Sequence, residues 1–160
     1  TVSHMANVNG LTAVLHAGDI SYANGNHSRW DSWFESIQHL SRRVPWHVIP
    51  GNHEIEINKS TGSIFDAYEH RFQMPSNREA EKSPFMKSKS AKTCCPSSMI
   101  GQYDYGNAYH AVTYGPVRVI FLNSYTSSLH GSKQYNWLLE ELALVDRSVT
   151  PWLIVIMHCP

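Results

Sequence analysis

Short runs of apolar and aromatic residues recur along the chain and predict buried β-strands. Glycine, proline or polar residues bound each run, as is typical of strand ends. The predicted strands are Leu11–Leu15, Val44–Ile49, Gln102–Tyr105, Tyr109–Tyr114, Val117–Leu122 and Trp152–Met157.

Between these runs, three segments place apolar residues at helical spacing. The first begins at Ser28, which forms a capping-box pattern with Asp31. The second includes Phe65 and Phe72, and the third begins at Ser132. Strands that alternate with helices predict an α/β fold whose sheets are covered by helices on both faces.

The stretch 76–100 departs from this pattern. It is rich in serine and lysine, contains Pro84 and Pro96, and shows no apolar period. Its length predicts a solvated surface insertion within one domain that covers residues 1–160.

Charge and hydropathy narrow the classes of binding partner. Thirteen basic residues balance thirteen acidic ones, so no charge excess indicates nucleic acid or an anionic membrane. No apolar run reaches the roughly 18 residues of a membrane span.

The three cysteines are Cys94, Cys95 and Cys159. Cys94 and Cys95 are neighbours, which disfavours a disulfide between them, so the cysteines do not decide between an oxidising and a reducing compartment. The pattern specifies no oligomeric state.

Potential metal ligands follow three of the predicted strands. Asp19 comes after the first strand with Tyr22 close behind, Asn52 follows Val44–Ile49, and His158 follows the last strand. Asp19 and Asn52 are separated by about one strand–helix–strand crossover, so they can end neighbouring parallel strands. Because α/β sheets bind ligands beyond the carboxyl ends of their strands, we expect the four side chains at one rim of the sheet.

These residue types suit a pair of metal ions that hydrolyses phosphate esters. Two ions about 3.5–4 Å apart can clamp a phosphate and activate a water, but they repel each other, so Asp19 is the candidate shared anion. Asn52 and His158 offer neutral ligands to a divalent ion such as Zn²⁺ or Mn²⁺. The phenol of Tyr22, with an ordinary pKa near 10, favours a strongly acidic partner such as Fe³⁺.

His53 and Glu54 extend the candidate site. His53 should point away from the ligand before it, along an extended segment, and can protonate a departing alkoxide at mildly acid pH. Glu54 can accept a hydrogen bond from that ring and orient it. His27, in the loop after Tyr22, is a candidate substrate gate. We interpret the remaining strand and helix histidines as structural: His16, His39, His47 and His110.

Three sequence blocks carry a family resemblance: Gly18-Asp19-Ile20-Ser21-Tyr22, Gly51-Asn52-His53-Glu54 and Val155-Ile156-Met157-His158. They resemble the Gly-Asp-x-x-Tyr, Gly-Asn-His-Glu and Val-x-x-His blocks of purple acid phosphatases, a family of calcineurin-like metallophosphoesterases. Segment 65–75 is similar to one in the larger, plant-type members. The tyrosine separates this family from other calcineurin-like phosphoesterases.

The resemblance implies metallophosphoesterase-type mixed sheet layers flanked by helices, and an acid phosphatase with a binuclear Fe(III)–M(II) centre. Asp19 would bridge the metals and Tyr22 would bind Fe³⁺. Asn52 and His158 would bind the divalent ion, which is Zn, Mn or Fe in this family. His53 would sit at the substrate phosphate. The substrates would be small phosphomonoesters.

The resemblance also implies a secreted, vacuolar or lysosomal glycoprotein; Asn26 and Asn58 begin acceptor patterns. Two family blocks, Gly-Asp-x-Gly before these and Gly-His-x-His after them, do not occur here. We therefore expect a fragment that lacks a first strand and a C-terminal part, binds metals poorly and is nearly inactive alone.

Two other functions stay open. One is a phosphodiesterase or nucleotide pyrophosphatase that uses the same metal chemistry. The other is a non-catalytic phosphoesterase-like module that binds a phosphorylated ligand or a partner.

Overall fold

The computed structural model describes residues 2–76 and 100–159 of the 160-residue chain. Its elements, in chain order, are α1 (Val2–Ala6), β1 (Val14–Ala17), α2 (Ser28–Ser41), β2 (Trp46–Ile49), the 3₁₀ turn η1 (Asn52–Glu54), α3 (Asp66–Arg71), β3 (His110–Tyr114), β4 (Val117–Phe121), α4 (Lys133–Ala143) and β5 (Trp152–Ile156).

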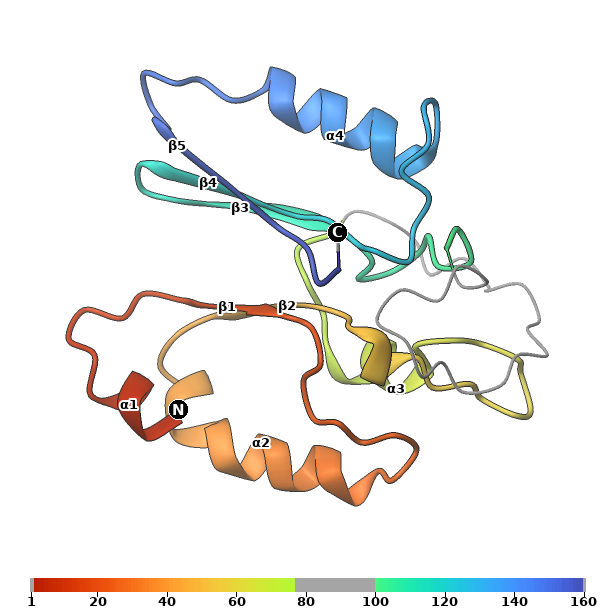
Figure 1. Cartoon of the computed structure of the whole chain (residues 1–160). Coiled ribbons are helices and arrows are strands. Elements are labelled where there is room, and N and C mark those ends of the chain that lie inside the picture. Colours follow the sequence, from red (N-terminus) through yellow and green to blue (C-terminus); the bar gives the residue numbers. More distant parts are fainter. Residues whose placement is uncertain (1, 77–99, 160) are drawn as a thin grey trace.

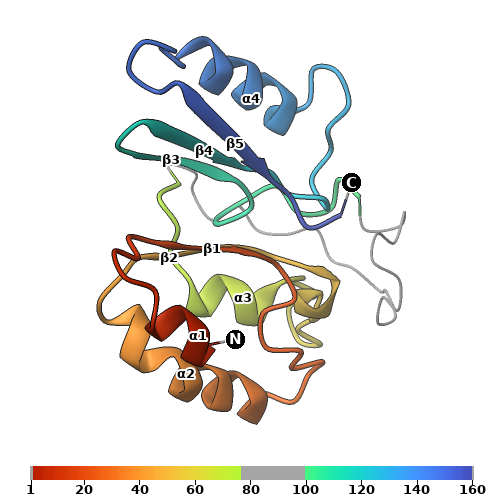
Figure 2. The same ribbon diagram turned by 60° about the vertical axis from the view of Figure 1, so that its left-hand side comes forward.

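Two β-sheets face each other, and each carries a helix on its outer side (Figures 1 and 2). β1 and β2 form a parallel pair, while β4 pairs antiparallel with β3 and parallel with β5. The layers therefore follow in the order α2, first sheet, second sheet, α4 (Figure 1). This arrangement confirms the mixed sheet layers flanked by helices that the sequence predicts.

Buried aromatic and apolar side chains hold the two sheets together. His47 of β2 lies between them, with its Nε2 2.6 Å from the hydroxyl of Tyr114 and its ring 5.6 Å from that of His110. Ile49 packs in the same layer against Phe121. Burial lowers the pKa of His47, so this side chain is neutral while it links the sheets.

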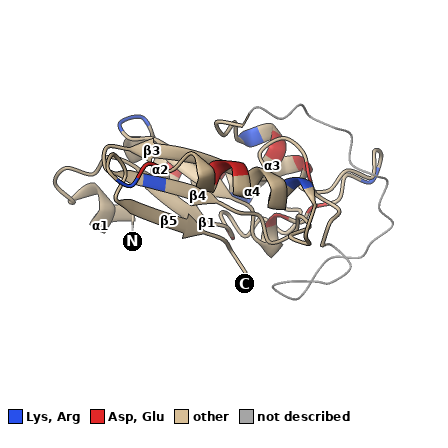
Figure 3. Cartoon of the chain, turned by 90° about the horizontal axis from the view of Figure 1, so that it is seen from above, with Lys and Arg blue, Asp and Glu red and all other residues tan. Residues whose placement is uncertain are grey.

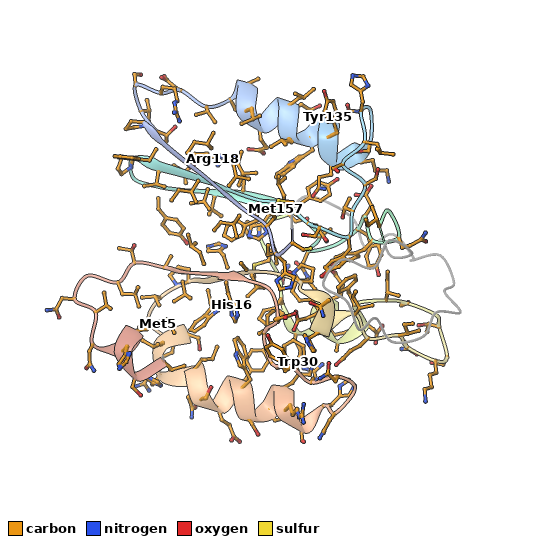
Figure 4. All side chains as sticks on the ribbon, viewed as in Figure 1. Met5, His16, Trp30, Arg118, Tyr135 and Met157 are labelled. Atoms are coloured by element: carbon orange, nitrogen blue, oxygen red, sulfur yellow. The ribbon has the colours of Figure 1, made fainter. Side chains whose placement is uncertain are left out.

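Helix α2 begins at Ser28, as predicted, but its capping box does not form. The N-cap is His27, and the hydroxyl of Ser28 instead donates to Asn26 Oδ1 at 2.8 Å. The amide oxygen of Asn26 also accepts from the Ser28 backbone, so this side chain closes the turn that precedes the helix. The buried face of α2 carries Trp30 (labelled in Figure 4) toward the first sheet.

The predicted strand Gln102–Tyr105 is wrong. Tyr103 and Tyr105 are buried but lie in a loop, where the Tyr103 ring packs against those of Phe65 and Tyr105 with centroid distances of 4.4 and 4.7 Å. The alternation of aromatic residues in this segment therefore reflects burial of their side chains and not pairing of a β-strand. Most of the predicted insertion 76–100 lies outside the described residues.

The sequence predicts sheets covered on both faces, but the inner face of β5 is partly exposed. Trp152 and Ile154 are 67% and 42% exposed, although they share the inner face of the second sheet with Val119, the cross-strand partner of Ile154. On the facing edge, Leu15 of β1 is 36% exposed. Both edge strands pair on one side only, so the layer between the sheets is open where β1 and β5 lie.

In the part of the chain described, no helix combines the length and the hydropathy that crossing a bilayer requires. Basic and acidic residues are interspersed along the ribbon around α3 (Figure 3).

Candidate metal centre

The ends of β1, β2 and β5 meet at one point, and two glycines permit it. Gly18 has φ +81°, and a Cβ there would lie 2.6 Å from the Gly51 nitrogen and 2.8 Å from His158 Nδ1. A Cβ on Gly51 would overlap Asp19. Only residues without a side chain let these three segments approach so closely.

The four predicted ligand side chains come together at this junction. His158 Nε2 lies 3.5 Å from Asp19 Oδ1 and 3.2 Å from Asn52 Oδ1. The hydroxyl of Tyr22 hydrogen-bonds to Asp19. β5 belongs to the second sheet, so the junction spans two sheets and does not lie along one rim as the sequence suggested. Figure 4 labels Met157, the neighbour of His158, where β5 approaches the first sheet.

Hydrogen bonds fix the orientation of His158. Its Nδ1 lies 2.7 Å from the carbonyl oxygen of Ala17, which can only accept, so Nδ1 carries a proton. The next residue, Cys159, donates its N–H to the Ser124 hydroxyl at 2.9 Å, and that hydroxyl donates to the Cys159 carbonyl at 2.6 Å. These hydrogen bonds hold the end of β5 in place, and Nε2 of His158 faces the junction.

The donor atoms at the junction fit a cation. With the proton on Nδ1, the Nε2 lone pair of His158 faces the oxygens of Asp19 and Asn52, and three electron-rich atoms at these distances repel one another unless a positive charge lies among them. Carboxylate, amide oxygen and imidazole are ordinary metal ligands. The described residues contain no group of three or more His, Cys, Asp or Glu side chains that could hold a metal. The four candidate ligands at this junction include only two residues of those types, and the other two are Asn52 and Tyr22.

Tyr22 is held beside Asp19 by its backbone. Tyr22 has φ 50°, a left-handed conformation, and its carbonyl oxygen accepts from Arg29 Nη1 at 2.7 Å. Its ring centroid lies 4.2 Å from that of His53. The hydrogen bond to the Asp19 carboxylate raises the pKa of Tyr22, so the phenol stays protonated unless a strong Lewis acid displaces the proton.

Glu54 links the loops after β1 and β2, and this corrects its predicted role. Its Oε2 accepts from the backbone N–H groups of Asp19 and Gly51, both at 2.8 Å, and its Oε1 accepts from that of Ile20 at 2.7 Å. No hydrogen bond joins it to the His53 ring among these contacts. Glu54 is 1% exposed, and burial raises its pKa to about 6.

Asn24, which the sequence did not single out, takes the place predicted for Glu54. Its Oδ1 lies 2.7 Å from His53 Nδ1, so the amide oxygen orients the ring. His53 lies in a 3₁₀ turn and not in an extended segment, and its backbone N–H donates to Asp19 Oδ1 at 3.1 Å. The sequence signal for Asn24 was the turn dipeptide with Gly25, which marks a loop but not a contact.

A cavity of about 700 Å³ adjoins the junction. Asn52 and His53 line it at the side of the candidate ligands, and His27 and the loop of residues 55–60 line the rest. His27 Nδ1 lies 3.3 Å from Arg71 Nη2. The histidine predicted as a substrate gate thus borders the same cavity as His53.

Comparison with known proteins establishes the family. Residues 3–160 match the sequence pattern of the calcineurin-like phosphoesterases. The chain belongs to that family. This phosphoesterase chain is 34% identical over 166 residues to a phosphoenolpyruvate phosphatase of Allium cepa, and 31% identical over 183 residues to purple acid phosphatase 15 of Arabidopsis thaliana. Each match covers 100% of the chain and 30% of the relative, so the chain spans less than a third of these proteins.

The fold comparison agrees. A purple acid phosphatase isolated from yellow lupin (Lupinus luteus) seeds superimposes with a TM-score of 0.66 at 24% identity, over 94% of this chain and 24% of that one. At this identity the match shows the fold. Together the comparisons confirm the predicted resemblance, and membership in the family implies a dinuclear metal centre.

Proposed function

We propose that the protein carrying this chain is a metal-dependent acid phosphatase that hydrolyses small phosphomonoesters. One observation carries the proposal: Asp19, Tyr22, Asn52 and His158, which are far apart in sequence, converge where three strand ends meet. Stability alone gives no reason to gather a carboxylate, a phenol, an amide and an imidazole at one partly exposed point.

In this proposal Asp19 would be the ligand shared by two metal ions, Tyr22 would hold Fe(III), and Asn52 and His158 would hold a divalent Zn, Mn or Fe ion. When bound, such a pair would supply positive charge for the phosphate and lower the pKa of a water. The chain itself orients these ligands. Glu54 holds the backbone of Asp19, and the carbonyl of Ala17 holds the His158 ring with Nε2 toward the site.

His53 is the proposed acid for the leaving group. Asn24 binds its Nδ1, so Nε2 is the atom that can deliver a proton into the adjoining cavity. Proton delivery from Nε2 requires the doubly protonated imidazolium, which is why we expect activity at mildly acid pH. Contact with Tyr22 limits rotation of the ring.

The chain represents part of a catalytic domain in this proposal, with a surface insertion at about 76–100. Its partner is a small phosphate ester and not nucleic acid or a membrane. We propose a secreted, vacuolar or lysosomal glycoprotein, because Cys159 is disulfide-bonded and disulfides persist in oxidising compartments. Asn26 is exposed and is the better placed of the two predicted sugar acceptors.

The proposal is tested with the complete protein that contains this sequence, purified with its metals. We expect hydrolysis of an aryl phosphate monoester at acid pH and a visible charge-transfer band that Tyr22→Phe removes or shifts. An iron-loaded wild type without such a band would refute the tyrosinate ligand. Faster hydrolysis of diesters than of monoesters would assign the site to a phosphodiesterase, and metal binding without turnover of either would favour a binding module.

A further inference from the structure

The cavity beside His53 has a far wall that the proposed chemistry does not use. Asn52 and His53 form the near side, and the loop of residues 55–60 forms the far side (at the right of Figure 1, yellow). A phosphate held at the junction of strand ends would direct its organic group into this space of about 700 Å³. The far wall is therefore placed to contact the leaving group and not the phosphate.

Asn58 makes the far wall a fixed structure. Its Oδ1 accepts from the backbone of Ser60 and of Thr61 at 3.0 and 3.3 Å, and from the Ser60 hydroxyl at 2.6 Å. Its Nδ2 donates to Asp66 Oδ2 at 3.2 Å, and its backbone N–H donates to the Ser63 carbonyl at 2.9 Å. The backbone that carries Lys59 is thus an ordered turn, so anion binding has to order only the lysine side chain.

Lys59 is the basic residue of the cavity's described lining. Lys59 is exposed on the far wall, and Arg71 contacts His27, which also lines the cavity. The guanidinium can only donate, so His27 Nδ1 accepts and its Nε2–H remains a donor. Glu56 is the one acidic residue among the cavity's described lining; its Oε1 accepts from the Gly25 N–H at 3.0 Å, and its Oε2 is buried.

The geometry points to a subsite, formed by Lys59 and His27, that binds a second anionic group on the leaving-group side of the substrate. The protein would then prefer phosphomonoesters whose organic part carries a carboxylate or a further phosphate. This inference rests on the proposed phosphatase function and adds its substrate class. Lys59 and His27 bind and position the substrate in this scheme and take no part in bond breaking.

Three substrates that differ in one substituent test the subsite in the complete protein: phenyl phosphate, 3-carboxyphenyl phosphate and benzene-1,3-diyl bisphosphate. The measurement is the ratio of kcat/KM for each charged substrate to kcat/KM for phenyl phosphate. Lys59→Met should lower this ratio about two- to fivefold, as expected for one exposed ion pair, and Lys59→Glu should lower it further. Lys133→Met, a lysine on α4, is the matched control and should leave the ratio unchanged.

Comparison of the kcat/KM ratios for 3-carboxyphenyl phosphate and benzene-1,3-diyl bisphosphate shows which anion the subsite prefers. Equal ratios in the wild type and both Lys59 variants would overturn the subsite, even with phosphatase activity intact. Binding of phenylphosphonate and 3-carboxyphenylphosphonate, measured by calorimetry, gives the same ratio without turnover. If no substrate is hydrolysed, the phosphatase proposal fails, while a Lys59-dependent preference for the carboxylated phosphonate would still support the subsite.

Discussion

Replacement of Glu54 by glutamine should destabilise the protein in a pH-dependent way. The carboxylate accepts three backbone N–H groups with its two oxygens, and the side chain is 1% exposed. Glu54→Gln keeps one carbonyl oxygen and turns an NH₂ group toward a backbone donor. One buried N–H is then left without an acceptor, which costs about 1–3 kcal/mol.

The pKa of Glu54 sets the pH dependence. Burial raises this pKa from 4.5 to about 6, so the folded state holds the proton more tightly than the unfolded state. The stabilisation from this proton is fully present below pH 4.5 and is lost as the pH rises through 6. A shift of about 1.5 units corresponds to about 2 kcal/mol. Buried neutral histidines such as His47 act in the opposite direction, but they cancel in a comparison of wild type and variant.

The assay is urea unfolding of the metal-free protein from pH 4 to pH 7. We expect the unfolding free energy of the wild type to rise by about 2 kcal/mol relative to that of Glu54→Gln between pH 7 and pH 4, because only the wild type takes up a proton at this position on folding. Glu35→Gln, an exposed change on α2, is the control and should stay within about 0.5 kcal/mol. A wild-type advantage that grows as the pH rises would refute the reasoning, since it would mean that the three amides lower the pKa more than burial raises it.

Three other predictions concern the site and the open edge. Gly18→Ala should cost at least about 2 kcal/mol in urea unfolding and abolish metal binding, because its Cβ would lie 2.6 Å from the Gly51 nitrogen at φ +81°; unchanged metal content would show that the strand ends are not so close. Asn24→Asp places a carboxylate against His53 and should move the alkaline limb of the kcat/KM profile up by about one pH unit; an unmoved limb would remove His53 as the acid. Trp152→Ser should reduce binding of a hydrophobic dye by the isolated chain, since Trp152 is 67% exposed on the inner sheet face; equal dye binding would locate the apolar surface elsewhere.

The sequence predicted the end of β2 at Ile49 correctly and placed the end of β1 at Leu15, two residues before its actual end at Ala17. Apolar runs that stop at Gly18 and Gly51 mark strands that end in ligand-bearing loops, and the crossover length between them predicts their parallel pairing. The aromatic run Gln102–Tyr105 failed because buried tyrosines in a loop and in a strand show the same alternation.

Long-range partners were the part of the site that sequence reasoning could not predict. Nothing near His53 in sequence shows that Asn24 binds its ring, and nothing near Glu54 shows that its carboxylate binds backbone amides from the other loop. Both contacts depend on how two loops after different strands turn in space. The stacking of a second sheet, which brings His158 to the junction, likewise depends on packing between layers and not on periodicity.

Metal content is the most direct test of the junction as a dinuclear centre. The complete protein and its Asp19→Asn variant would be compared by elemental analysis after purification under identical conditions, with circular dichroism as a check of folding. Asp19 is the only one of the four side chains proposed to touch both ions, so the wild type should hold about two metal ions per chain and the folded variant distinctly fewer. A folded variant that retains both ions would contradict the assignment of Asp19 as the bridge.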